Sequence, residues 1–411
     1  MTTVRALPPV WLMGLGFLPV GVFSAILLMI VPQLLAANHV PEQEIASITT
    51  IGLFPFFGAF ILSPLLDWRF SRRTYAIATT IIGALCAFGA LVSINNLALL
   101  TALLFTANVA VTLGSNAVGG WLGNLIETDN KGRLGAWLNV GNIGSLGVAA
   151  AVAMSLLRDL PYLLGAGVLS GFVLLALPLY WVIPCPPADK RLASETIRDF
   201  SRDVLNLLKK PSVLWTLLIF LPPAASFALT NTLGGMGNDF HTSEALVGLW
   251  GGAGAFVAGI AGSLLIPRFE ELIAPKPLYL VIGTLGALFT LGLVALPHSP
   301  ATFGTAMLGE NLFQGAAFSV QNFIMLRTIG HNNPLAATQF GLLASAQSLP
   351  LVYMQAIDGN AYGLFGGVNG SYLADALISG AFCMILGLLI WFFRAAIARG
   401  DNEAEGVATL G

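Results

Sequence analysis

The sequence predicts an all-α membrane protein whose twelve transmembrane helices form two six-helix halves. Its composition is the first observation: of 411 residues, 56% are hydrophobic and only 9% are charged, whereas soluble globular proteins are about 25% charged. The second is that apolar runs of about 20 residues, the length that crosses a bilayer core, follow one another along the chain. Because such long, non-alternating runs satisfy their backbone in lipid only as helices, we predict a helical bundle.

Short polar, Pro-rich or Gly-rich breaks separate the predicted spans. The spans cover approximately residues 11–35, 45–66, 74–94, 97–122, 134–157, 161–183, 212–237, 244–267, 277–297, 301–326, 334–357 and 371–394.

The distribution of positive charge is the third observation, and it predicts orientation. The two tails and the even-numbered connections hold every Lys and Arg of the 18 in the chain except Arg158. Because Lys and Arg are enriched in cytoplasmic connections, both termini are expected in the cytoplasm, with the chain as a multi-pass protein of the inner membrane. The alternation also supports an even number of spans.

The longest connection divides the chain into an N-terminal six-helix bundle (1–183), a cytoplasmic linker (184–211) and a C-terminal six-helix bundle with a short cytoplasmic tail (212–411). Within the linker, apolar residues from Ile197 to Leu208 recur at helical spacing, with Arg and Lys among them. This pattern suits a helix lying on the inner leaflet. A solvated loop helix is an equally good interpretation.

Polarity recurs with a period of three spans. Spans 3, 6, 9 and 12 contain long stretches without Asn, Gln, His or charged residues, such as 278–296 and 376–393. Spans 4, 7 and 10 instead carry Asn108, Asn116, Asn124, Asn231, Asn238, Glu310, Asn311, Gln314, Gln321 and Asn322. Polar residues in a membrane usually face the bundle interior or a watered cavity. Two six-span halves with this periodicity resemble the major facilitator superfamily, in which the first helix of each three-helix repeat lines a central cavity.

Two segments, ENLFQGAAFS at 310–319 and AATQFGLLAS at 336–345, resemble the tenth and eleventh helices of AmpG-type permeases in the peptide/acetyl-coenzyme A transporter family. Likewise, LPVGVFSAILLMIVPQLL at 18–35 and ILSPLLDWRFSRR at 61–73 resemble that family's first two helices and the loop after them. The resemblance covers most of the chain. It implies proton-coupled uptake of a small polar solute, such as a siderophore or a cell-wall muropeptide, by alternating access.

One departure from that family lies on the fourth span. Where family members carry two aspartates, this chain has Asn116 and Gly119 within SNAVGGWLGN, although Trp121 is retained. Any role of those aspartates is therefore not carried over to this protein.

Glu310 is the most conspicuous residue, because it lies within the apolar run MLGENLFQGAAFSVQN. It is about nine residues into its span, or roughly 13 Å, close to the midplane. No Lys or Arg occurs in the middle of any predicted span, so a proton, a cationic solute or a water-filled cavity is expected to compensate its charge. The first option makes Glu310 a proton-coupling residue. The alternative is a permanently protonated acid that holds helices together.

Candidate substrate ligands are the other polar or aromatic residues on the spans expected to line the cavity. They are Asn116, Trp121, Asn231, Asn311, Gln314, Gln321, Gln339 and Gln347. Taken singly, such residues are more often packing contacts than ligands. Since a polyanion would require midplane cations, a neutral, zwitterionic or partly cationic solute fits better than acetyl-coenzyme A.

Asp67, Arg72 and Arg73 in SPLLDWRFSRR are a candidate conformational gate, at the place where the superfamily has an acidic and basic gate. An aspartate there can pair with basic groups in one conformation and lose them in the other. The alternative is that the arginines only anchor the loop on the cytoplasmic side. Asp358 and Asp375 are expected at the outer ends of their spans, exposed to solvent.

Several classes of function are excluded by the same inspection. No Gly-rich loop leads into a Gly-Lys pair, so ATP is not the expected energy source. Cys86, Cys185 and Cys383 share no metal-type spacing, and neither a nucleophile-base arrangement nor a basic nucleic-acid face is present. We expect no enzyme activity, no cofactor and no metal, and a monomer whose partners are a small-molecule substrate, protons and membrane lipid. An exporter of a small metabolite and a non-transporting receptor or scaffold are the alternative functions, although a scaffold has no need of a midplane carboxylate.

Overall fold

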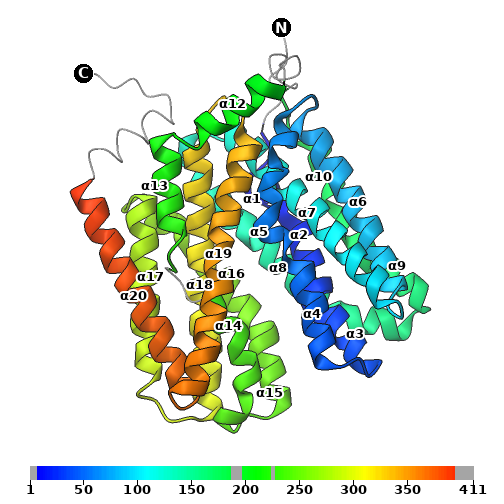
Figure 1. Ribbon diagram of the computed structural model, residues 1–411, viewed down its shortest axis with the longest axis vertical. Coiled ribbons are helices and arrows are strands. Elements are labelled where there is room, and N and C mark those ends of the chain that lie inside the picture. Colours follow the sequence, from blue (N-terminus) through cyan, green and yellow to red (C-terminus); the bar gives the residue numbers. More distant parts are fainter. Residues whose placement is uncertain (1–6, 187–196, 224–226, 394–411) are drawn as a thin grey trace. The chain divides into compact units, whose positions relative to one another are not determined.

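The computed structural model describes residues 7–186, 197–223 and 227–393, and all secondary structure in these ranges is helical (Figure 1). Ten of the described helices are long and apolar enough to cross a membrane. The two other predicted spans correspond to α13 (Pro211–Phe220) with α14 (Phe227–Leu233), and to α18 (Pro300–Ile329). α18 is 30 residues long, but its polar side chains make it less hydrophobic than the ten.

The chain forms two compact units that we call unit 1 and unit 2. Unit 1 contains residues 1–126, 141–207 and 331–345, and unit 2 contains residues 127–140, 208–330 and 346–411. Two helices, α8 (Lys131–Asp159) and α19 (Ala336–Leu364), therefore begin in one unit and end in the other. As a result, each unit includes a short segment from the opposite half of the sequence.

Unit 1 has its core among the first, fourth and sixth predicted spans. Phe23, Ile26, Leu104 and Leu169 are all completely buried there. Its other helical segments are α1 (Val10–Gly14), η1 (Leu15–Phe17), α2 (Leu18–Ala25), η2 (Ile26–Ile30), α3 (Val31–Ala37), α4 (Glu42–Leu53), α5 (Pro55–Gly58), η3 (Ala59–Ile61), η4 (Ser63–Asp67), α6 (Arg72–Val92), α7 (Leu97–Leu125), α9 (Tyr162–Gly171), η6 (Phe172–Ala176), α10 (Leu177–Val182) and α12 (Ile197–Leu207). The helix predicted in the linker is thus present as α12.

Unit 2 has its core around Leu229, Phe240, Phe303 and Tyr372, which are also completely buried. In addition to α13, α14 and α18, its segments are η5 (Thr128–Asn130), η7 (Gly234–Phe240), α15 (Glu244–Gly248), η8 (Leu249–Gly254), α16 (Ala255–Phe269), α17 (Pro275–Leu293) and α20 (Val368–Phe392). α18 packs against α16 and α17, and α17 packs against α20.

The last two helices extend further toward their common loop than the sequence indicates. α19 continues to Leu364, beyond the predicted end at 357, and α20 begins at Val368. Asp358 and Asp375 consequently lie inside these helices, where they are 0% and 1% exposed. The expectation that these two aspartates are solvated is wrong. The sequence stretch near the loop contains Gly and Asn residues that obscured the helix ends, and tertiary packing extends both helices through them.

Glycine allows α16 and α18 to pack backbone against backbone. A Cβ atom on Gly315 would lie 2.0 Å from the carbonyl oxygen of Gly259, and one on Gly262 would lie 2.0 Å from the carbonyl oxygen of Leu312. Small residues permit this close approach of membrane helices. The position of α18, which carries Glu310, therefore depends on these glycines.

We predict that Gly315→Ala destabilises the protein by about 1–3 kcal/mol, because the added methyl group forces the two helices apart. The free energy of unfolding in mixed micelles, measured by detergent titration, tests this. Gly387→Ala on α20 is the matched control, since no atom lies within 4 Å of the added Cβ. Equal stability of the two variants would contradict the prediction.

Candidate functional site

Glu310 is 0% exposed on α18. Its Oε1 lies 2.6 Å from the hydroxyl oxygen of Thr290 on α17, and that hydroxyl oxygen lies 3.0 Å from the carbonyl oxygen of Gly286. A threonine hydroxyl has one proton to donate. The Thr290 hydroxyl donates to Glu310, and it shares the same proton with the Gly286 carbonyl oxygen, so the carboxyl group receives less than a full hydrogen bond from it. This local geometry suits a glutamic acid that carries a proton.

The other polar side chains of α18 point to different neighbours. Gln321 donates from Nε2 to the Tyr279 hydroxyl on α17 at 2.7 Å, whereas Gln314 donates to the Thr230 hydroxyl on α14 at 3.1 Å. Asn311 donates to the Met307 carbonyl oxygen of its own helix at 2.8 Å. The polar residues of α18 are thus divided between a buried side facing α17 and a half-buried side facing α14.

Asp67 caps the beginning of α19 within unit 1. Its carboxylate accepts hydrogen bonds from the backbone N–H groups of Ala337 at 3.2 Å and Thr338 at 2.7 Å, and from the Thr338 hydroxyl at 2.8 Å. Because α19 begins at Ala336, these are otherwise unsatisfied N–H groups of its first turn, where negative charge is favourable. Asp67 is therefore bound to the helix that follows the loop after α18.

Arg72 completes this arrangement. Its Nε donates to Asp67 Oδ1 at 2.8 Å, and its Nη2 donates to the carbonyl oxygens of Asn333 at 3.1 Å and Pro334 at 2.8 Å. Asn124 of α7 donates to the same Asn333 carbonyl oxygen at 2.8 Å. The end of η4, the start of α6 and the end of α7 are in this way all bonded to the segment that leads into α19.

Arg73 has a separate set of contacts. It donates to the carbonyl oxygen of Ile183, and its guanidinium carbon lies 5.4 Å from the centre of the Trp121 ring. Trp121 is buried and donates from Nε1 to the Pro184 carbonyl oxygen at 2.8 Å. These two residues fix the end of α10. Trp121, a predicted substrate ligand, has a structural contact here.

The remaining predicted ligands do not form one group. In unit 1, Asn116 donates to Ser63 at 3.0 Å and Gln339 accepts from Asn333 at 2.7 Å, and both are buried. In unit 2, Gln347 is buried on α19 and Asn231 is exposed on α14. Asn116, Trp121 and Gln339 lie near the candidate gate through Ser63, Arg73 and Asn333. Asn311 and Gln314 lie within about one helical turn of Glu310 on α18, whereas Gln321 lies about three turns further along that helix.

The segment from Lys131 to Arg133 at the start of α8 is a second candidate for such a gate in the sequence. Lys131 is completely buried, and its Nζ donates to the Gly330 carbonyl oxygen at 3.3 Å, just after the end of α18. A cation is favourable at a helix C-terminus. Together with Asp67, charges from the first half of the sequence cap the end of α18 and the beginning of α19. The charged run around 131–133 was the signal for such a contact.

Glu270 is a further residue that the sequence did not single out. It follows α16 outside the membrane spans, and its Oε2 is buried so close to Gly132 that a Cβ there would lie 1.2 Å from it. Burial raises the pKa of Glu270 to about 7, with Arg133 acting in the opposite direction and Glu271 in the same direction. Glu270 therefore changes its charge near neutral pH, at the start of α8.

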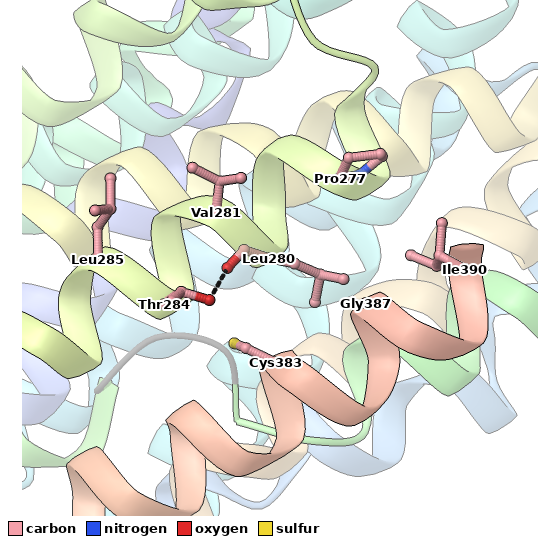
Figure 2. Close-up of a pocket in the computed structure, with 8 residues that line it drawn as sticks. All are labelled: Pro277, Leu280, Val281, Thr284, Leu285, Cys383, Gly387 and Ile390. Carbon is pink, nitrogen blue, oxygen red and sulfur yellow. Dashed lines mark hydrogen bonds between the residues drawn. The ribbon is translucent and has the colours of Figure 1, made fainter. Parts of the chain in front are cut away.

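An open groove of about 340 Å³ lies between α17 and α20 in unit 2 (Figure 2). Apolar side chains such as Leu280, Val281 and Ile390 line it, and the Thr284 hydroxyl there donates to the Leu280 carbonyl oxygen of its own helix at 2.8 Å. The groove offers little to a polar solute. It is not a candidate binding site for one.

Comparisons with known proteins agree with this architecture. A family profile described as Major Facilitator Superfamily matches residues 13–355. A search of curated protein sequences found no match.

Solved structures of transporters superimpose on most of the chain. The E. coli fucose:proton symporter FucP is 16% identical with a TM-score of 0.67, covering 92% of this chain and 97% of its own. The proton:xylose symporter XylE is 13% identical with a TM-score of 0.64 (93% and 94%), and the human organic anion transporter MFSD10 is 16% identical with a TM-score of 0.69 (92% and 100%). These similarities confirm the predicted fold class, and the AmpG-type resemblance stays a prediction.

We predict that Asp67→Ala increases the hydrogen-exchange rates of the Ala337 and Thr338 amides by about tenfold or more, because loss of a helix cap costs roughly 1–2 kcal/mol. Exchange measured by mass spectrometry on the purified protein tests this. The control is Asp159→Ala, an exposed acid at the end of α8. Unchanged protection of the first turn of α19 in Asp67→Ala would show that the cap contributes nothing.

A second prediction concerns pH. Folded Glu270 binds its proton more tightly than the unfolded chain does, since its pKa is raised from 4.5 to about 7. The unfolded state therefore loses the proton first, and this group makes the folded state less stable as pH rises from about 4.5 to 7, with no further change above that range.

Glu270→Gln should accordingly match the wild type in thermal midpoint near pH 5 and exceed it near pH 8, as a protein without that titration would. Midpoints measured across this range for wild type, Glu270→Gln and the exposed control Glu127→Gln test it. A constant difference between wild type and Glu270→Gln at all pH values would contradict it.

Proposed function

Because the chain belongs to the major facilitator superfamily, a family of membrane transporters and not of enzymes, we propose that it is a secondary active transporter that takes up a small polar solute together with protons. Glu310 is the proposed proton-binding residue. The proposed location is the inner membrane, with both termini in the cytoplasm, as the distribution of Lys and Arg indicates.

The observation that carries the proposal is the environment of Glu310. Its carboxyl group is fully buried in a membrane helix and hydrogen-bonded to Thr290, in a geometry that suits the protonated form. Loss of that proton would leave a charge in an apolar interior, which is costly until the surroundings change. Protonation is thereby linked to conformation, and this link is what proton-coupled transport requires.

The contacts of Asp67 support a role in the conformational cycle. We propose that Asp67 and Arg72 hold the beginning of α19 in one conformation and release it in another, and that Arg73 keeps the end of α10 in place. Asp67 makes three hydrogen bonds to Ala337 and Thr338. Anchoring of the loop on the cytoplasmic side would not require these bonds. Such a set of charge-assisted bonds can be broken and remade as a unit.

The proposed substrate is neutral, zwitterionic or partly cationic, because amide side chains predominate in the polar parts of the spans. Asn311 and Gln314 are the leading ligand candidates, since both are half-buried beside Glu310. A siderophore or a muropeptide is the proposed substrate on the resemblance to AmpG-type permeases. The structurally similar proteins FucP and XylE are a fucose:proton symporter and a proton:xylose symporter. A monosaccharide is therefore a further candidate substrate.

Proteoliposomes with an imposed pH gradient test the proposal on a hydroxamate siderophore, a muropeptide and a neutral monosaccharide. For one proton per solute, a gradient of one pH unit supports about tenfold accumulation, because about 1.4 kcal/mol corresponds to a factor of ten. We expect the wild type to accumulate one of these solutes. Glu310→Gln should abolish the accumulation while solute exchange without a gradient continues.

The exposed acid Glu244, in the same unit, gives the matched control variant Glu244→Gln, which should behave as wild type. Wild-type accumulation by Glu310→Gln would remove Glu310 from the coupling mechanism. Movement only in the opposite direction would identify an exporter, and failure of all three solutes to move would favour a receptor or scaffold.

A further inference from the structure

Three acids that interact electrostatically with one another are buried on three helices of unit 2. Glu310 on α18 and Asp358 on α19 are 0% exposed, and Asp375 on α20 is 1% exposed. Asp358 interacts electrostatically with Glu310, and Asp375 interacts with both of the others. Like charges repel in an apolar interior, so the ionisation of one of these acids opposes the ionisation of the other two.

The hydrogen bonding of this cluster indicates that it holds protons. Both carboxyl oxygens of Asp358 and Oδ2 of Asp375 are buried without a hydrogen-bond partner in the described part of the chain, and so is the hydroxyl oxygen of Tyr372. Tyr372 also interacts electrostatically with Glu310. An ionised carboxylate without a donor is very costly in such surroundings, whereas a neutral carboxylic acid is tolerated. Protonation of Asp358 would remove this cost.

The three acids lie at different depths from the nearest ends of their helices. Asp358 is six residues before the end of α19 and Asp375 seven residues after the start of α20, which is roughly 10 Å from these helix ends at 1.5 Å per residue. Glu310 is ten residues after the start of α18, or roughly 15 Å. These three helix ends lie on the side opposite the Lys- and Arg-rich connections, which is the outer side.

Polar groups continue toward that side. Tyr362, one helical turn beyond Asp358 on α19, is half-buried and donates a hydrogen bond to Asp239 at 2.8 Å. Glu310 and Asp375 are thus the titratable groups that interact with Asp358, Tyr372 interacts with Glu310, and the Tyr362 and Asp239 pair lies toward the helix end. Within the described residues, no group of three His, Cys, Asp or Glu side chains has an arrangement that could hold a metal ion.

We infer that Asp358 and Asp375 are additional proton-binding residues that receive protons from the outer side and pass them to Glu310. In the transfer step, the O–H bond of the donor aspartic acid breaks and an O–H bond forms on the Glu310 carboxylate. The negative charge moves to the aspartate, which then takes a proton from outer water. This inference rests on the proposed proton coupling through Glu310, but its site and its test are separate.

Infrared spectroscopy of the full chain in proteoliposomes tests this inference, because the C=O stretch of a protonated carboxylic acid is separate from carboxylate bands. Difference spectra between acidic and alkaline buffer give the titration of the buried acids. We expect Asp358→Asn and Asp375→Asn each to remove part of the carboxylic acid band, and each to move the half-titration point of the band that remains. Glu244→Gln should leave both unchanged. The thermal midpoint of each variant establishes that it is folded.

A wild-type spectrum and titration in both folded Asn variants would overturn the inference. Removal of the acid band at constant pH by added sodium would also overturn it, since the cluster would then be a sodium site. The proposed function can fail independently, when Glu310→Gln keeps proton-driven accumulation although the aspartates titrate as expected. If both hold, Asp358→Asn should slow proton-driven uptake by about tenfold or more, as loss of a general proton-transfer group does.

Discussion

A polar group inside a membrane bundle has to be satisfied within the protein, because lipid provides no hydrogen bonds. This constraint explains where the polar side chains of α18 lie. Gln321 reaches Tyr279, Gln314 reaches Thr230, and Glu310 reaches Thr290. Each bond fixes α18 against a neighbouring helix, so the residues that make this helix less hydrophobic also determine its orientation. An acid among them adds a requirement that amides do not have, since its hydrogen bonding depends on its protonation state.

The same constraint applies to helix ends. The first turn of α19 has N–H groups without partners in the helix, and Asp67 supplies acceptors for two of them at Ala337 and Thr338. The last turn of α18 has carbonyl groups without partners, and Lys131 supplies a donor at Gly330. Both contacts join residues more than 190 positions apart in the sequence. Both contacts are charge-assisted hydrogen bonds made by buried side chains.

How much could be predicted from the sequence depended on the kind of signal. The spans followed from long apolar runs, and Glu310 was conspicuous because a charge in such a run has few explanations. The contact between Asp67 and Arg72 is also present, although its role as a gate stays a prediction. The ligand candidates could not be resolved in this way. Trp121 and Gln339 have the same residue types as substrate ligands, but their partners, Pro184 and Asn333, could be identified only in three dimensions.

By itself, the sequence determined the helical class, the alternation of charge across the membrane and the isolated acid of α18, because these depend on composition and local spacing. Only the tertiary structure decided which helix each polar side chain meets. It buried Asp358 and Asp375, which interact electrostatically with Glu310, where the sequence had indicated solvated helix ends. The physical reason is that burial depends on neighbouring helices and not on the position of a residue along its own helix.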